Sequence, residues 1–108
     1  MRRGDLVVVA TPGDFGKPRP ALIVQSDLFD EHPSTTLCLL TTHLQQAPLF
    51  RYPVAPTSDN GLSELSQIQI DMIMTVPKQK IGMTIGRLTE RQMNEITRLL
   101  ALWVGVAD

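Results

Sequence analysis

The chain alternates short apolar runs with segments rich in glycine and proline, and only its last segment has the pattern of a helix. The runs at 6–10 and 21–24 are continuous, rich in β-branched residues and bounded by Gly and Pro, which is typical of buried strands. A third run of this kind covers 35–40. Strands followed by a single terminal helix predict an antiparallel sheet or small barrel, because alternating βα units would interleave the two patterns.

Two weaker strands are predicted in the middle of the chain. Residues 51–54 form a short run that contains a proline, which suits an edge strand better than a central one. Residues 66–71 alternate polar and apolar side chains, as a half-buried strand does. This alternation puts Gln67, Gln69 and Asp71 on one face. Residues 75–77 and 80–82 are expected to be brief extended pieces around a turn.

The C-terminal segment has the clearest helix signal. Thr89 followed by Gln92 three residues later is a capping box, in which each side chain satisfies a backbone amide of the other residue. Gly105 is a natural helix terminator. Apolar residues at helical spacing form one stripe that should face the sheet. These residues are Met93, Ile96, Leu99, Leu100, Trp103 and Val104.

Size and charge restrict the function classes. A chain of 108 residues is expected to form a single domain over residues 1–108. The formal net charge of −1 excludes a global basic field, but not a local basic groove. Cys38, the single cysteine, lies in an apolar run and is expected to be a core residue in a reducing compartment. The apolar run near the N-terminus is too short for a signal or membrane span, so we expect a cytoplasmic protein without membrane contact.

Arg19 lies between Pro18 and Pro20, where a Gly-rich loop re-enters the predicted sheet. Proline restricts both its own backbone and that of the preceding residue, so the backbone that carries the Arg19 side chain is rigid. A guanidinium held in this way suits a phosphate group. From the loop alone, a rim arginine paired with a nearby carboxylate is the more ordinary interpretation.

Familiar catalytic motifs are missing from the sequence. His32 and His43 are far apart and lack a cysteine cluster, so no metal site is predicted. There is no phosphate-binding loop of the Walker or dinucleotide type and no Gly-x-Ser-x-Gly elbow. Polar groups do gather at predicted strand ends and can meet on one surface if the sheet folds back on itself. They are Arg19, Thr41, Thr42, His43, Gln67, Gln69 and Asp71.

A family resemblance covers nearly the whole chain in order. Residues 3–7 and 19–27, the strand ending at Thr41, the block 61–71 and the tail 81–105 together resemble the MazF/PemK/Kid toxins. The resemblance implies an SH3-like barrel of antiparallel strands closed by a C-terminal amphipathic helix, acting as a homodimer. It also implies sequence-specific cleavage of single-stranded mRNA through attack by the 2′-OH, without metal or other cofactor. A cognate antitoxin protein is the implied inhibitor.

The resemblance assigns Arg19 and Thr41 to catalysis, as the phosphate-stabilising cation and hydroxyl. Sequence-specific reading of single-stranded RNA uses amide hydrogen bonds and aromatic stacking, and basic charge attracts the backbone. We therefore expect a set of RNA-binding residues around this pair, in which His43 is also a candidate general acid. The set is Lys17, Phe15, Thr42, His43, Gln67, Gln69 and Asp71.

The chain departs from the family pattern at two places. The first loop lacks the glutamate of many relatives, with Asp14 as a candidate replacement, and Gln69 stands where some relatives have arginine. Two alternatives to the ribonuclease stay open. One is a gyrase poison of the CcdB type acting through the tail around Trp103, although that residue also belongs to the apolar stripe. The other is a non-catalytic member that only binds an antitoxin.

Overall fold

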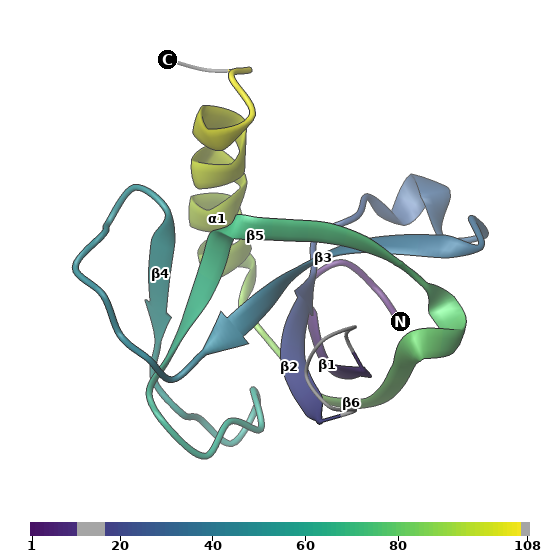
Figure 1. Ribbon diagram of the computed structural model, residues 1–108, viewed down its shortest axis with the longest axis horizontal. Helices are drawn as coiled ribbons and strands as arrows, with labels where there is room; N and C mark the ends of the chain where they lie inside the picture. The colour runs from purple at the N-terminus through teal and green to yellow at the C-terminus, as the bar shows by residue number, and fades with distance from the viewer. Residues whose placement is uncertain (11–16, 107–108) are drawn as a thin grey trace.

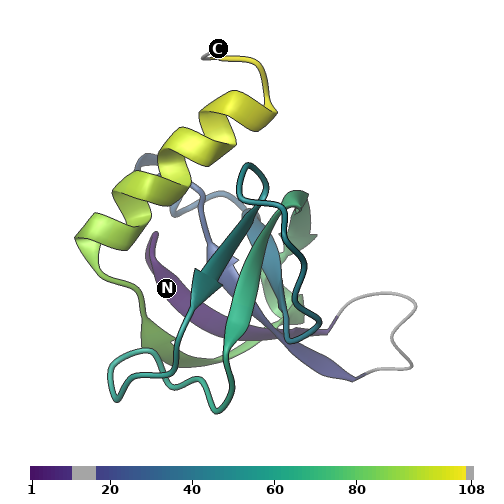
Figure 2. The same ribbon diagram turned by 90° about the vertical axis from the view of Figure 1, so that its left-hand side faces the viewer.

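The computed structural model describes residues 1–10 and 17–106 of the chain. In these residues a bent β-sheet carries one α-helix, whose C-terminal end projects beyond the strands (Figures 1 and 2). The strands are β1 (Asp5–Ala10), β2 (Pro18–Ile23), β3 (Ser34–Thr41), β4 (Arg51–Val54), β5 (Ser66–Pro77) and β6 (Ile81–Arg87). The helices are the short 3-10 helices η1 (Asp27–Phe29) and η2 (Lys78–Lys80), and the α-helix α1 (Glu90–Trp103).

The six strands form one sheet in the order β4-β5-β3-β2-β1-β6, and every neighbouring pair is antiparallel. The mostly-β class with a C-terminal helix is therefore confirmed. Within the described residues the edge strands β4 and β6 do not pair with each other, so hydrogen bonds do not close the sheet into a complete barrel. The proline of β4 lies on an edge strand, as its sequence predicted.

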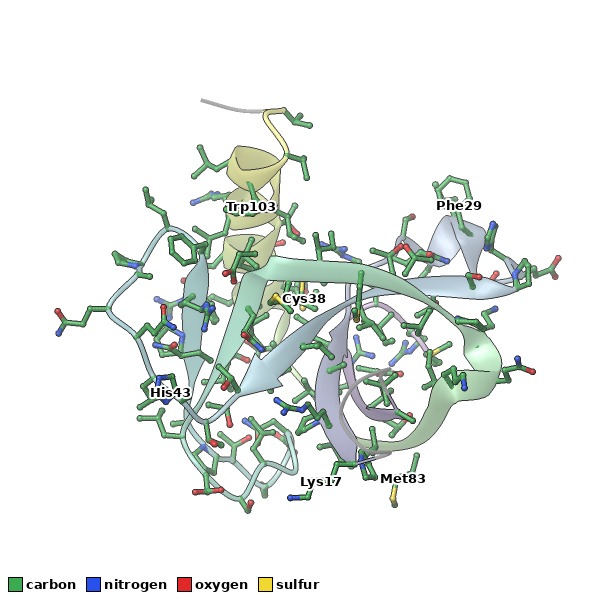
Figure 3. All side chains as sticks on the ribbon, viewed as in Figure 1. Lys17, Phe29, Cys38, His43, Met83 and Trp103 are labelled. Carbon is green, nitrogen blue, oxygen red and sulfur yellow. The ribbon has the colours of Figure 1, made fainter. Side chains whose placement is uncertain are left out.

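Both faces of the central strands are buried, which explains their continuous apolar runs. Alternate residues enter two clusters. In β2, Leu22 joins the cluster that α1 covers, whereas Ala21 and Ile23 join the cluster on the opposite face. Cys38 lies in the cluster beneath the helix and is fully buried, as expected (Figure 3).

The capping box at the start of α1 is confirmed. The Thr89 hydroxyl accepts a hydrogen bond from the Gln92 N–H, and the Gln92 side chain accepts one from the Thr89 N–H. Of the predicted stripe, Met93 and Ile96 are buried against the sheet. Trp103 is 49% exposed, because the last turns of the helix extend past the strands.

β5 differs from its prediction. The sequence predicted a strand over 66–71 and a separate extended piece at 75–77, but one strand runs from Ser66 to Pro77. A bulge joins the two parts: Cys38 and Leu40 of β3 are two residues apart, whereas their partners Ile73 and Ile68 are five apart. The extra residues bend β5 over the sheet (Figure 1).

No helix in the described part of the chain is long and apolar enough to span a membrane.

Candidate functional site

Arg19, Thr41 and Gln67 form a row across three neighbouring strands. In the β2–β3 ladder Ala21 pairs with Leu39, so the same register continued by two residues sets Arg19 opposite Thr41. In the β3–β5 ladder Thr41 pairs directly with Gln67. Opposed residues on antiparallel strands have neighbouring side chains on one face. The strand pairing therefore gathers three residues that are far apart in the sequence.

A pocket of about 140 Å³ lies at this place. Arg19 and Thr41 both line it, and Thr42 follows directly from the end of β3. Its other lining residues are Pro20, Leu40 and Ser66. The pocket thus combines a guanidinium with hydroxyl groups over an apolar base, which suits an anionic group of about phosphate size.

The Thr41 hydroxyl has a defined orientation. Its oxygen accepts a hydrogen bond from the backbone N–H of His43, with an N–O distance of 3.1 Å. A hydroxyl has one donor and two acceptor positions, so this bond leaves the O–H proton available to another group. Thr41 is half-buried at the pocket, where a bound oxygen can accept that proton.

Gln67 is buried, and its amide is bound to the loop that follows β3. Its Nε2 donates to the Gln45 carbonyl at 2.8 Å, and its Oε1 accepts from the Gln45 N–H at 3.0 Å. The sequence predicted an open-face amide for RNA contact. The structure instead gives both ends of this amide a partner within the protein.

Asp71 is likewise engaged. Arg51 of β4 holds it by two hydrogen bonds, Nε–Oδ1 at 3.0 Å and Nη2–Oδ2 at 3.1 Å. Arg51 pairs in register with Gln69, which is half-buried. Of the three side chains predicted to share a face, Asp71 is therefore in a forked ion pair with Arg51, and the opposite charges compensate each other.

The other predicted RNA-binding residues are exposed or lie outside the described residues, and of these only Thr42 lines the pocket. Lys17, Thr42 and His43 are exposed. Figure 3 shows Lys17 at the bottom of the view and His43 at its lower left, both away from Trp103 at the end of α1. The candidates Phe15 and Asp14 lie outside the residues that the structure describes.

The sequence did not predict two residues of the site, Ser66 and Gln45. Ser66 lines the pocket because it precedes Gln67 at the start of β5, and Gln45 contributes only backbone atoms. Neither has a sequence signal of its own, since both depend on the β3–β5 register. A larger hollow of about 620 Å³ lies near β6 and includes Asp5 and Arg87, but these two side chains form an ion pair with each other.

Comparison with known proteins identifies the family of this chain. Residues 2–104 match the family model described as PemK-like, MazF-like toxin of type II toxin-antitoxin system. A protein of Mycolicibacterium smegmatis named probable endoribonuclease MazF is 43% identical over 108 residues, which cover 99% of each chain. Endoribonuclease EndoA of Bacillus subtilis is 23% identical and matches across 100% of this chain and 97% of its own length.

Solved structures show the same fold. A mycobacterial endoribonuclease in complex with its cognate antitoxin superposes with a TM-score of 0.80 at 27% identity, covering 100% of this chain and 98% of the other. The Mycobacterium tuberculosis toxin MazF-mt6 also gives a TM-score of 0.80, at 22% identity, over 94% and 96% of the two chains.

These findings define a toxin of the type II toxin–antitoxin class with a small, bent β-sheet and a terminal helix. Within that class, the chain belongs to the PemK-like, MazF-like toxin family. Three of these relatives carry the name endoribonuclease, one of them as a probable one, and none of the names supports the gyrase-poison alternative.

Proposed function

We propose that this MazF-like toxin endoribonuclease cleaves single-stranded RNA in the Arg19–Thr41 pocket, without a metal or other cofactor. The observation that carries the proposal is that one pocket is lined both by Arg19 and by Thr41, whose hydroxyl oxygen is already hydrogen-bonded to the His43 N–H. This combination provides fixed donors for a phosphate that gains negative charge during the reaction.

The reaction needs no external nucleophile. The 2′-oxygen of RNA attacks the adjacent phosphorus, a new O–P bond forms, and the bond from phosphorus to the 5′-oxygen breaks. The 2′-hydroxyl loses its proton and the departing 5′-oxygen gains one. The products are a 2′,3′-cyclic phosphate and a free 5′-hydroxyl.

Arg19 and Thr41 act on the charge that develops at phosphorus. The Arg19 guanidinium donates to non-bridging oxygens with a geometry that matches phosphate. The Thr41 hydroxyl donates a further hydrogen bond, because its acceptor side is turned to the His43 N–H. His43, exposed beside Thr41, is our candidate for the proton given to the 5′-oxygen, since histidine exchanges protons near neutral pH.

Sequence-specific RNA binding is assigned to residues that surround this pair. Lys17 supplies backbone attraction, while Thr42, His43 and Gln69 offer hydrogen bonds to bases or sugars. Phe15 stays a prediction from the sequence for base stacking. We reassign Gln67 and Asp71 from contact to support, because their polar atoms are engaged with Gln45 and Arg51.

The biological setting follows from the family. We propose that the chain acts in the cytoplasm as a homodimer and that a cognate antitoxin protein inhibits it. The mycobacterial endoribonuclease solved with its antitoxin supports this assignment, because its fold covers the whole of this chain.

The test is cleavage of a long RNA by purified protein in excess EDTA, with the cut ends mapped. We expect discrete cuts that leave cyclic phosphates. Arg19→Ala and Thr41→Val should each slow cleavage by roughly 10²–10³-fold, the usual cost of one lost charge-stabilising donor. The matched controls are Arg98→Ala on the exposed side of α1 and Thr84→Val on β6, both of which should leave the rate unchanged.

Two results would overturn this function. A folded wild-type protein that cuts no RNA at any concentration would favour the non-catalytic, antitoxin-binding alternative. Full cleavage by Arg19→Ala would place the chemistry outside the pocket even if the wild type is active.

A further inference from the structure

We infer that Gln67 is a positioning residue for the reaction, which orients the Thr41 hydroxyl through the backbone of the loop between them. The inference rests on the proposed function of the Arg19–Thr41 pocket. It depends on two contacts joined by the chain from His43 to Gln45: Gln67 binds the Gln45 backbone, and the His43 N–H binds Thr41.

The loop after β3 has little else to hold it. Residues 42–46 are all exposed, so none of their side chains anchors the loop in a core. The buried Gln67 amide instead binds the Gln45 backbone at both its N–H and its carbonyl. Two hydrogen bonds from one planar amide fix the distance and the orientation of the bound peptide segment. Gln67 therefore determines where the loop lies relative to β5.

The position of this loop reaches the pocket through His43. The His43 N–H donates to the Thr41 oxygen, two residues before the segment that Gln67 holds. Because the His43 N–H points at the Thr41 hydroxyl oxygen, the hydroxyl proton of Thr41 cannot point toward His43. The proton is therefore directed to the other side of the hydroxyl, where it can be donated. Loss of the Gln67 contacts should therefore let the hydroxyl rotate, which weakens its donation to phosphate.

Glutamine suits this role because one side chain must both donate and accept. In Gln67→Glu, the carboxylate still accepts from the Gln45 N–H, but its second oxygen faces the Gln45 carbonyl oxygen. Gln67→Leu removes both bonds and leaves the backbone groups of Gln45 to water. The direct register of Gln67 with Thr41 makes the loop connection short.

The experiment measures kcat and KM on a short RNA for the wild type, Gln67→Glu and Gln67→Leu. Gln79→Glu and Gln79→Leu are the matched controls, because Gln79 is exposed in η2 at another part of the sheet. We expect kcat to fall between about 10- and 100-fold in both Gln67 variants, as misplacement of a reacting group does, while KM changes less than about twofold. The controls should match the wild type.

A double-mutant cycle separates positioning from general damage to the fold. If Gln67 acts through the Thr41 hydroxyl, Gln67→Leu should cause no further loss of kcat in a Thr41→Val background. Amide hydrogen exchange provides a readout without RNA: the Gln45 and His43 N–H groups should lose protection in Gln67→Leu, which removes both bonds, whereas the amides of β1 keep theirs. Gln67→Glu, which retains one bond, guards against failure of Gln67→Leu to fold.

The outcomes are distinguishable. Unchanged kcat with lost Gln45 protection, or full additivity with Thr41→Val, overturns the positioning role while the function stands. Retained Gln45 and His43 protection in Gln67→Leu overturns the loop contact itself. A wild type that cuts RNA only at sites insensitive to Arg19→Ala and Thr41→Val contradicts the proposed function instead.

Discussion

Arg51 and Asp71 form a forked ion pair between β4 and the bend of β5, with two nitrogen–oxygen distances of 3.0 and 3.1 Å. The Arg51 side chain is only 10% exposed, and its guanidinium carbon lies 5.9 Å from the centre of the Phe50 ring. The pair therefore links the edge strand β4 to the bulged strand β5. It also neutralises Asp71, which would otherwise repel RNA phosphates.

Breaking this pair should destabilise the protein. Arg51→Met leaves the Asp71 carboxylate without its partner, and we expect the free energy of unfolding to fall by about 2 kcal/mol, which is within the range for hydrogen bonds to charged groups. Urea denaturation at pH 7 measures it. The double variant Arg51→Met/Asp71→Leu should lose less than the sum of the single variants, and simple additivity would show that the two groups act independently.

Tyr52 and Glu95 provide a pH-dependent link between β4 and α1. The Tyr52 hydroxyl donates to the Glu95 carboxylate. Burial, followed by this hydrogen bond and the negative charge of Glu95, raises the pKa of Tyr52 to about 12 from 10.0. Because the neutral phenol is favoured in the folded state, its stabilising contribution is complete below pH 10 and is lost as the pH rises toward 12.

The absorbance of tyrosinate measures this directly, since Tyr52 is the only tyrosine in the chain. We expect the native protein to titrate near pH 12 and the urea-unfolded protein near pH 10. Glu95→Gln should lower the native midpoint, because the carboxylate charge is removed. A native midpoint equal to the unfolded one would contradict the Tyr52–Glu95 contact.

The local patterns of the sequence were sufficient for most elements of the fold. Continuous apolar runs predicted β1, β2 and β3, and the Thr89–Gln92 pair predicted the start of α1. These signals depend on residues close together in the chain. The unbroken length of β5 was missed because its bulge is set by pairing with β3, which local patterns do not report.

At the candidate site, too, the sequence indicated the residue types but not the contacts that depend on strand pairing. Residue type and family resemblance selected Arg19 and Thr41, and the strand register then set them in one pocket. The contacts of Gln67 with the Gln45 backbone had no sequence signal, because an amide bound to a peptide group looks the same in sequence as an amide open to solvent. Alternation predicted which face Gln67 occupies, but not its partner.

Trp103 tests the discarded gyrase alternative. Its ring lies 6.1 Å from that of Phe50 at an interplanar angle of 48°, so it links the end of α1 to the segment before β4. We expect Trp103→Ala to lower the free energy of unfolding by about 1–2 kcal/mol, since the side chain, although 49% exposed, loses its contact with the Phe50 ring. RNA cleavage by the folded variant should stay unchanged.

The control for Trp103 is Leu28→Ala, at a residue that is 86% exposed in η1. This substitution should change the stability by less than about 0.5 kcal/mol. Circular dichroism during urea denaturation serves for both variants, because Trp103 is the only tryptophan and its fluorescence is lost. Loss of toxicity in Trp103→Ala with unchanged stability and RNA cleavage would reopen a binding role for the tail.

The reactivity of the buried Cys38 thiol measures how often the core beneath α1 opens. The thiol is fully buried in the cluster beneath α1, and burial, with a smaller contribution from the Asp71 charge, raises its pKa to about 12 from 9.0. Since the thiolate is the reactive form, both access and charge protect this group in the native state. We expect the native thiol not to react with a disulfide reagent at pH 8 on the timescale of minutes, and one thiol per chain to react in urea.

Folding favours the neutral Cys38 thiol, so its contribution to the free energy of unfolding is complete below pH 9 and is lost as the pH rises toward 12. The matched comparison is Arg51→Met, which should react faster than the wild type if the pair with Asp71 holds the sheet over Cys38. Rapid reaction of the native wild type would show that this core opens without global unfolding.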